Sequence, residues 1–311
     1  MAYNSSINRT GAQALVPEDA SREIIQNVPE SSAILRLARR LPNMSTDARR
    51  MPVLSNLLTA YFVTGDTGLK QTTQAAWENK YINAEELAVI VPIPENVLAD
   101  TGYDVWSEIR PRIVEAFGYA FDQAVMYGTN APDDWPTDLL AGAVAAGNSV
   151  TLGAGVDLYD DVMGTSGTIS KVEADGYMVT GHVGAMTMRS RLRGLRDANG
   201  VPIFVRTMQG ATQYELDGAP IEFPSSVIPT SSLLFSGDFK QVVYSMRQEI
   251  TYKMLTEAVI TDSAGNIVIN LAQQDMVALR AVMRIGWQLP NPLNRFQQIE
   301  ANRYPIAVLL P

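Results

Sequence analysis

A few residues of this sequence have types and spacing that could perform chemistry. His182 is the only histidine of the 311-residue chain, and an imidazole can act as a general base near neutral pH. Paired carboxylates could hydrolyse a glycosidic bond or bind a divalent cation. The stretch "GTSGTISK", residues 164–171, superficially resembles a phosphate-binding loop. The acidic groups are Asp133 with Asp134, and Asp157 with Asp160 and Asp161.

Each of these patterns also has a simpler structural interpretation. A single histidine in a chain without cysteine cannot build a multi-ligand zinc site, and no partner for a catalytic triad is identifiable. Adjacent acids in turn-rich sequence are commonly solvated, and residues 164–171 lack the spacing of a nucleotide-binding loop. We therefore expect His182 at a helix start or in the core. We predict no catalytic residues, no cofactor and no metal site.

Two short segments concentrate arginine. Phosphate binding is one interpretation. However, the net charge of −9 argues against a nucleic-acid binder, and leucine and methionine rather than aromatic residues lie between the arginines. We therefore expect ion pairs with acids of a neighbouring chain, ahead of a solvated face. The arginines are Arg36, Arg39, Arg40, Arg49 and Arg50 in one segment and Arg189, Arg191, Arg193 and Arg196 in the other.

The composition predicts a globular, intracellular protein. Hydrophobic residues make up 46% of the chain and charged residues 18%, and the absence of cysteine excludes disulfide bonds. The N-terminal sequence has no apolar core of a signal peptide, and no apolar run approaches the roughly 20 residues that cross a bilayer. A chain of this length suggests two domains or one elaborated domain.

The elements that must position any site include two conspicuous extensions. Residues 1–28 are polar and predict an extended arm. Two strand-like runs, residues 51–63 and 77–91, flank a polar tip. Both runs are far longer than the usual strand of about five or six residues, so we expect their hairpin to project from the body. Between the arm and the hairpin, a helix is predicted over Pro29–Leu41, with Ser31 or Ser32 as its cap.

The clearest helix is predicted over residues 103–128. Its apolar residues recur every three or four positions, and Gly128 ends it. Pro111 should kink this helix or mark its first turn. Helical spacing also predicts helices over 182–200 and 273–289. Strands are predicted in "YELDGAPIEF" around a turn at Asp217 and Gly218, in residues 233–255, and in the C-terminal "YPIAVLLP", with short mixed elements over residues 140–230.

The order of these elements resembles the major capsid proteins of tailed phages. The segments that carry the resemblance are "RRMPVLSNLLTAYFVTGDTGLKQTTQAAWENKYINAEELAVIVPIPENVLAD", "MYGTNAPDDWP", "RLRGLRDANGVPIF", "YELDGAPIEF" and "LLFSGDFKQVVYSMRQEI". The resemblance extends from about residue 28 to the C-terminus. It implies the α+β fold of Hong Kong 97 phage (HK97-like). It also implies a structural protein whose copies form a closed icosahedral shell around double-stranded DNA in the virion head, assembled in the bacterial cytoplasm.

The resemblance also implies a division of the chain into parts. The parts are the N-arm at 1–28, an N-terminal helix region at 29–49, the E-loop at 50–92, a peripheral (P) domain at 93–129 and 233–295 with its spine helix at 103–128, and an axial (A) domain at 130–232 and 296–311. In this arrangement, both arginine segments would contact neighbouring subunits or line the shell interior.

We expect the E-loop to bury its apolar side chains on an adjacent subunit, because an isolated two-stranded hairpin is only marginally stable. Glycines at the tip would let one sequence adapt to non-equivalent positions in the shell. The residues expected in this contact are Tyr61, Phe62, Thr67, Gly68, Lys70, Trp77, Tyr81 and Ile82.

Some members of the family crosslink an E-loop lysine to an asparagine of a neighbour, assisted by a glutamate. Lys70 is the only lysine at the tip and matches the first role. The predicted helix over residues 273–289 should carry the other two, but it contains neither asparagine nor glutamate. We therefore predict non-covalent overlap of subunits.

The resemblance implies further partners. Copies of the chain would associate as hexamers and pentamers. A separate scaffolding protein is expected, because the shell elements begin near residue 28 and leave no room for a fused scaffolding segment. A portal is also expected, decoration proteins are left open, and DNA would be enclosed without sequence-specific binding.

Two alternative functions remain open at this point. An encapsulin-like nanocompartment would share the fold and enclose enzymes in place of DNA. A carboxylate-based hydrolase would use the Asp157–Asp161 cluster and would be a compact monomer.

Overall fold

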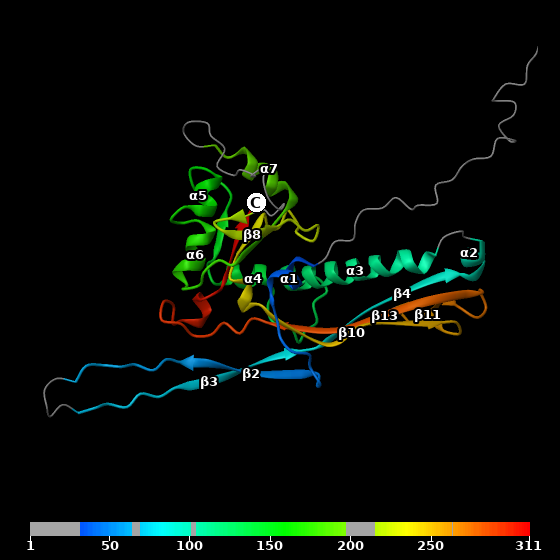
Figure 1. Cartoon of the computed structure of the whole chain (residues 1–311), viewed down its shortest axis with the longest axis horizontal. Helices are drawn as coiled ribbons and strands as arrows, with labels where there is room; N and C mark the ends of the chain where they lie inside the picture. The colour runs from blue at the N-terminus through cyan, green and yellow to red at the C-terminus, as the bar shows by residue number, and fades with distance from the viewer. Residues whose placement is uncertain (1–31, 64–68, 101–103, 197–214, 263) are drawn as a thin grey trace, which may run out of the picture.

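The computed structural model describes residues 32–63, 69–100, 104–196, 215–262 and 264–311. A long helix, α3, lies along one face of a four-stranded sheet (Figure 1). A six-stranded sheet surrounded by short helices lies at one end of this unit, and a two-stranded hairpin extends beyond it on the opposite side from α3 (Figure 1). None of the described helices is long and apolar enough to span a bilayer.

Helix α3 (Val105–Tyr127) confirms the strongest prediction. The Asp104 carboxylate accepts a hydrogen bond from the Ser107 amide at the N-terminus, and Gly128 ends the helix with a φ of 66°. Pro111 lies inside the helix and not in its first turn. The buried stripe of the helix faces the four-stranded sheet, and it consists of Ile113, Phe117, Phe121 and Val125.

The sheet under α3 contains the main correction to the predicted elements. Residues 273–289 do not form a helix, because Met276–Gln288 forms β13 at the centre of this sheet. Since β13 is paired on both sides and mostly buried, apolar residues occur on both of its faces and hide the two-residue period. The strand order is β1 (Arg39–Arg40), β10 (Val243–Leu255), β13 and β4 (Glu85–Pro94).

The predicted N-terminal helix is much shorter in the structure. Helix α1 (Ala33–Leu37) is capped by Ser32, whose hydroxyl accepts a hydrogen bond from the Leu35 amide. It ends early because β1 pairs in parallel with β10 immediately afterwards. A missed residue, Asp122 of α3, fixes the start of α1. Its buried carboxylate accepts hydrogen bonds from the Ser32 hydroxyl at 2.5 Å and the Ala33 amide at 3.0 Å.

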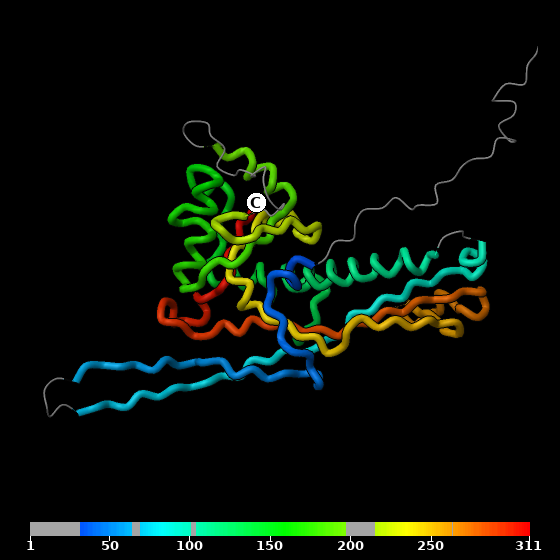
Figure 2. Tube along the Cα trace, in the orientation of Figure 1, coloured from blue at the N-terminus to red at the C-terminus, as the bar shows by residue number. Residues whose placement is uncertain are grey.

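The projecting hairpin is confirmed, with shorter strands than predicted. It consists of β2 (Ala48–Asn56) and β3 (Ala76–Asn83), which pair only with each other as a separate two-stranded sheet. The second predicted run divides at Ala84, and the chain then enters β4 and pairs with β13. Figure 2 shows both arms of the hairpin continuing side by side beyond these strands toward the tip.

The six-stranded sheet contains the C-terminal strand, as predicted. Its order is β5 (Ser149–Thr151), β14 (Ile306–Leu310), β9 (Leu234–Gly237), β6 (Gly181–Gly184), β8 (Ala219–Glu222) and β7 (Glu215–Leu216). The turn between β7 and β8 is at Asp217 and Gly218, whose φ angles of 51° and 71° confirm the predicted tight turn. Helix α7 (Met186–Gly194) begins after β6, so the helix predicted from residue 182 starts too early. The helix also ends at Gly194, before its predicted stop at Asn199 and Gly200, and those two residues lie outside the described residues.

The remaining elements are short. They are α2 (Glu95–Asp100), α4 (Leu139–Ala145), α5 (Leu158–Met163), α6 (Thr168–Ala174), η2 (Phe239–Gln241), η3 (Glu300–Asn302) and the small hairpin β11 (Val259–Thr261) and β12 (Ile267–Asn270). The division into N-arm, E-loop, P and A domains stays a prediction, and residues 1–28 lie outside the described residues.

Candidate functional site

His182 is a core histidine and not a helix-start residue. It lies in β6 with no exposed surface. Its Nδ1 is 2.9 Å from the Ser236 hydroxyl oxygen, and its Nε2 is 3.0 Å from the Leu216 carbonyl oxygen. Burial lowers the pKa of His182 to about 4, so the ring is neutral near pH 7. The imidazole therefore joins β7 to the sheet interior and is not exposed to a substrate.

The acidic cluster is used for local structure. The Asp157 carboxylate caps α5 by accepting a hydrogen bond from the Asp160 amide, and the buried Asp161 carboxylate accepts from the amides of Gly153 and Gly155, both at 2.7 Å. Among the described residues, no group of three or more histidine, cysteine or acidic side chains could hold a metal ion.

The stretch that resembles a phosphate loop has a structural role as well. Residues 168–174 form α6, and the Lys171 ammonium donates to the carbonyl oxygens of Gly147 at 2.8 Å and Ser149 at 2.9 Å. The lysine that a phosphate would require is therefore already bound to backbone oxygens of its own chain.

Arg36, Arg40 and Arg49 bind groups of their own chain. Arg36 pairs with Glu222 at 3.0 Å, and Arg40 pairs with Glu249 at 3.4 Å. Arg49 donates to the carbonyl oxygens of Pro42 and Asn43. Their contact with a neighbouring chain or the shell interior stays a prediction. The other arginines are exposed or half-buried, namely Arg39, Arg50, Arg189, Arg191, Arg193 and Arg196.

The hairpin carries large apolar side chains that its own chain leaves uncovered. Phe62 is fully exposed and Trp77 is 66% exposed. Tyr61 and Tyr81 are also exposed, as is Lys70 near the tip. Thr67 and Gly68, the other tip residues predicted to contact a neighbour, lie outside the described residues. The two strands of this hairpin pair only with each other, and the hairpin extends away from the long helix α3 (Figure 1).

Ile82 differs from the other residues predicted to contact a neighbour. It has no exposed surface, because it packs in its own chain against Met44, Ala84 and Val243. The expectation that Ile82 needs a neighbouring subunit for burial is therefore wrong. Alternation along β3 turns Ile82 into this small core at the base of the hairpin, while Tyr81 faces outward.

The base of the hairpin is attached to the four-stranded sheet by polar contacts that the sequence did not reveal. The Asp47 carboxylate pairs with Arg284 at 2.8 Å and also with Arg247. A Cβ at Gly286 would collide with the Asn83 carbonyl oxygen, so this glycine allows the end of β3 to approach β13. The only signal for Asp47 in the sequence is an acid that stands just before two arginines in "TDARR".

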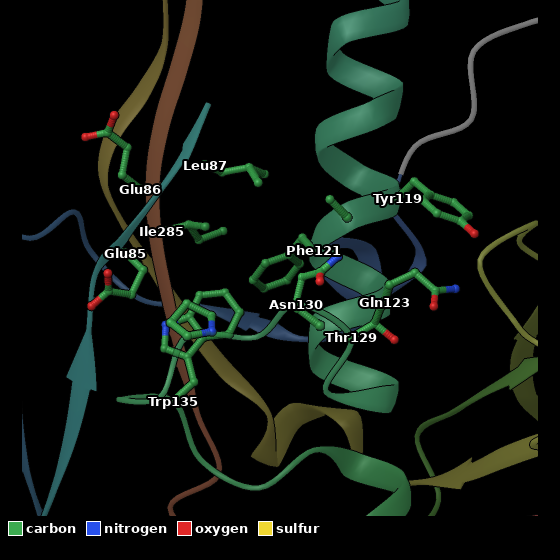
Figure 3. Close-up of a pocket in the computed structure, with 13 residues that line it drawn as sticks. Glu85, Glu86, Leu87, Tyr119, Phe121, Gln123, Thr129, Asn130, Trp135 and Ile285 are labelled. Atoms are coloured by element: carbon green, nitrogen blue, oxygen red, sulfur yellow. The ribbon is translucent and has the colours of Figure 1, made fainter. Parts of the chain in front are cut away.

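A cavity of about 340 Å³ lies beside this attachment, between α3, β4 and the connector that follows α3. Figure 3 shows the rings of Phe121 and Trp135 next to each other in it, with Glu85 and Glu86 on the strand side. The two rings meet edge to face, with centroids 5.9 Å apart. The described lining residues include no histidine, lysine or serine.

Comparison with known proteins identifies the family. A family model described as the phage capsid family matches residues 12–297. This chain belongs to the phage capsid family. Its α+β fold is the HK97-like capsid fold that the order of elements predicted.

Relatives of this capsid protein agree with that assignment. A solved chain from Microbacterium phage Oxtober96 is 36% identical with a TM-score of 0.85, and the match covers 99% of this chain and all of that chain. A solved chain from Mycobacterium phage Bobi is 31% identical with a TM-score of 0.81, covering 99% of both chains. The major capsid protein of Staphylococcus phage 80alpha is 28% identical over 274 residues, which are 85% of this chain and 78% of the relative.

The buried histidine predicts an acid-sensitive capsid protein. Because the folded-state pKa of His182, about 4, is below the ordinary value of 6.5, its contribution to stability is complete above pH 6.5 and is lost as pH falls toward 4. The maximum loss is about 3 kcal/mol per subunit. Calorimetric melting at pH 7 and pH 4.5 should show a smaller pH-dependent decrease for His182→Gln than for the native chain. Equal decreases would contradict this role.

The two ends of the hairpin should respond differently to truncation. Ile82→Ala removes a fully buried side chain and should lower the free energy of unfolding of the subunit by about 2–5 kcal/mol. Leu69→Ala, at a position 88% exposed, should change it by less than about 0.5 kcal/mol. Denaturant unfolding of the purified subunits measures both values. A similar loss for the two variants would show that Ile82 is not part of a core.

Proposed function

We infer that this capsid protein is the major capsid protein of a tailed phage and that its copies are held together by non-covalent overlap of the β2–β3 hairpin with neighbouring subunits. The observation that supports this overlap is the row of exposed apolar side chains on a hairpin whose strands pair only with each other. Large exposed apolar patches commonly mark protein–protein contacts.

The energetics favour burial on another copy. A tryptophan or phenylalanine that buries about 150–200 Å² gains about 4–5 kcal/mol at 25 cal/mol per Å², before the cost of ordering the hairpin. In a closed shell each subunit both gives and receives such a contact, so modest individual contacts combine into a stable assembly. A fully exposed Phe62 in a lone subunit leaves this free energy unused.

The charge of the chain agrees with a container for DNA. Its net charge of −9 repels the phosphate backbone, so a wall built from it would enclose DNA without binding specific sequences. In this proposal the protein is structural and performs no catalysis. A separate scaffolding protein, a portal and decoration proteins are further partners that the proposal includes as expectations.

The family match favours a phage shell over the two alternatives. The relatives described above come from phages, which supports a DNA-enclosing head over an encapsulin-like compartment. The hydrolase alternative depended on the Asp157–Asp161 cluster, in which the Asp157 carboxylate caps α5 and the Asp161 carboxylate accepts from two backbone amides.

Assembly itself provides the first test. Expression of the chain, alone and together with candidate scaffolding proteins from the same phage, should yield closed shells of tens of nanometres in negative-stain electron microscopy. A compact monomer in size-exclusion chromatography under every condition, with no shells, would contradict the proposed function.

Trp77→Ala should separate assembly from folding. Because Trp77 is largely exposed in the subunit, its loss should reduce shell yield or shell melting temperature while the melting temperature of the free subunit stays nearly unchanged. Trp77→Phe keeps an aromatic ring and should retain most of the assembly. If Trp77→Ala lowers the melting temperature of the free subunit as much as that of the shells, Trp77 has no specific role at the interface.

Mature particles should contain no covalent oligomers. Lys70 has no asparagine or glutamate to react with in β13, the strand that replaces the predicted helix. Denaturing gel electrophoresis of mature particles should therefore show a single band of the 34.0 kDa chain. A ladder of higher bands would overturn this prediction.

A further inference from the structure

The segment between β13 and β14 lies between the hairpin and the six-stranded sheet. We call residues 289–303 the bracket. Figures 1 and 2 show it, in orange to red, running beside the hairpin and below α5 and α6. The bracket has little regular structure apart from the single turn η3, so individual hydrogen bonds and ion pairs with other segments hold it in position.

One side of the bracket binds both arms of the hairpin. On the first arm, the Leu54 carbonyl oxygen accepts a hydrogen bond from the Leu293 amide at 3.3 Å. Further along the same arm, the Leu58 carbonyl oxygen accepts from the Arg295 guanidinium at 2.9 Å. On the second arm, the Lys80 ammonium lies 2.8 Å from the Glu300 carboxylate.

The contacts form a continuous seam. A cavity of about 60 Å³ lies between the two segments, and both contribute to its lining. Val53, Ser55 and Glu78 line it from the hairpin, and Pro290 and Gln298 line it from the bracket. The bracket therefore contacts the hairpin at several positions along its length and not only at one.

The other side of the bracket is fixed to the body. Arg303 is 2% exposed and donates to three oxygens of the bracket itself, namely the side-chain and backbone oxygens of Asn291 and the Gln297 carbonyl oxygen. The Asn294 amide donates to the Asp175 carbonyl oxygen at 2.7 Å. The Tyr177 hydroxyl donates to Asn291 at 2.9 Å. These contacts fold the bracket onto the segment that follows α6.

We propose that the bracket sets the direction in which the β2–β3 hairpin leaves its subunit, with Arg295 and Glu300 as positioning residues. The proposal rests on the proposed function, since it concerns the hairpin that would overlap a neighbour. The bracket contacts this hairpin on one side and the segment that follows α6 on the other.

The length of the hairpin is the reason that its direction must be fixed, because a small rotation at the base moves the tip a long way. Residues 48–63 span up to about 50 Å at 3.3 Å per residue, so a pivot of about 10° at the base would displace the tip by about 9 Å. Apolar contacts form only within about 4–4.5 Å. The attachment at Ile82 and Asp47 fixes the base alone, whereas Arg295 contacts the hairpin beyond the end of β2.

The test uses variants that break the seam without touching a core. Exposed ion pairs contribute little to folding stability, so Glu300→Gln and Arg295→Met, alone and combined, should leave the melting temperature of the subunit unchanged within about 2 °C. Hydrogen exchange at the amides of residues 53–58 should accelerate at least threefold in the combined variant. Exchange in β10 and β13 should stay the same.

A matched control comes from the second acid near Lys80. Glu78 lies 3.9 Å from the same ammonium but belongs to the hairpin, so Glu78→Gln should leave both exchange and assembly unchanged. Exchanging the two charges, as Lys80→Glu with Glu300→Lys, should restore much of the protection that Glu300→Gln loses. If exchange in residues 53–58 is unaffected by the combined variant, or if the exchanged pair gives no rescue, the bracket does not hold the hairpin.

Assembly supplies the second measurement. Shells of the combined variant should fall at least threefold in yield or become irregular in electron microscopy. In a chain without native cysteine, Leu54→Cys with Leu293→Cys can be joined by a short bismaleimide to keep the bracket closed. The joined subunits should assemble like the unjoined ones.

Two outcomes would overturn the proposal at this stage. Normal shells from the combined variant would show that the direction of the hairpin does not depend on the bracket. If the joined subunits do not assemble while the unjoined subunits do, the hairpin must leave the bracket during assembly. Absence of shells from the native chain would instead contradict the proposed function, while the exchange measurement still decides whether the bracket holds the hairpin.

Discussion

A two-stranded ribbon cannot cover the apolar side chains on both of its faces, and this constraint explains much of the molecule. The β2–β3 hairpin solves it at the base by packing Ile82 into a small core with Met44 and Val243. Beyond the base, Phe62 is fully exposed and Trp77 is 66% exposed in the part of the chain that the structure describes. The free energy that these side chains would gain on burial is available only from another molecule, which is what a subunit of a shell requires.

The rest of the fold provides a stiff support for that hairpin. Strand β3 passes directly into β4, so the second arm of the hairpin continues as an edge strand of the four-stranded sheet. That sheet is covered along its length by the 23-residue helix α3 (Figure 1). Asp47 ties the first arm to the same sheet through Arg284 and Arg247. Both arms of the hairpin are therefore attached at their base to the four-stranded sheet.

Elements that depend on a local sequence pattern, such as a helix period or a turn, could be predicted from the sequence. The helix period and Gly128 defined α3, and the positive φ angles of Asp217 and Gly218 confirmed the predicted turn. Strand β13 was mistaken for a helix because apolar residues occupy both of its faces. The length of the two strand-like runs predicted the hairpin. It did not predict the burial of Ile82, because that burial depends on residues that are distant in the sequence. The bracket left no local signal, since Lys80 and Glu300 are 220 positions apart.

Residues that suggested chemistry proved to be structural: His182 is neutral and buried, and Lys171 binds backbone carbonyls. The central claim is that the exposed face of the hairpin is covered by another copy of the chain. A cryo-electron microscopy reconstruction of assembled shells, at a resolution that shows side chains, tests it most directly. The account predicts Phe62 and Trp77 buried against an adjacent subunit. Shells in which both side chains remain exposed to solvent would contradict it.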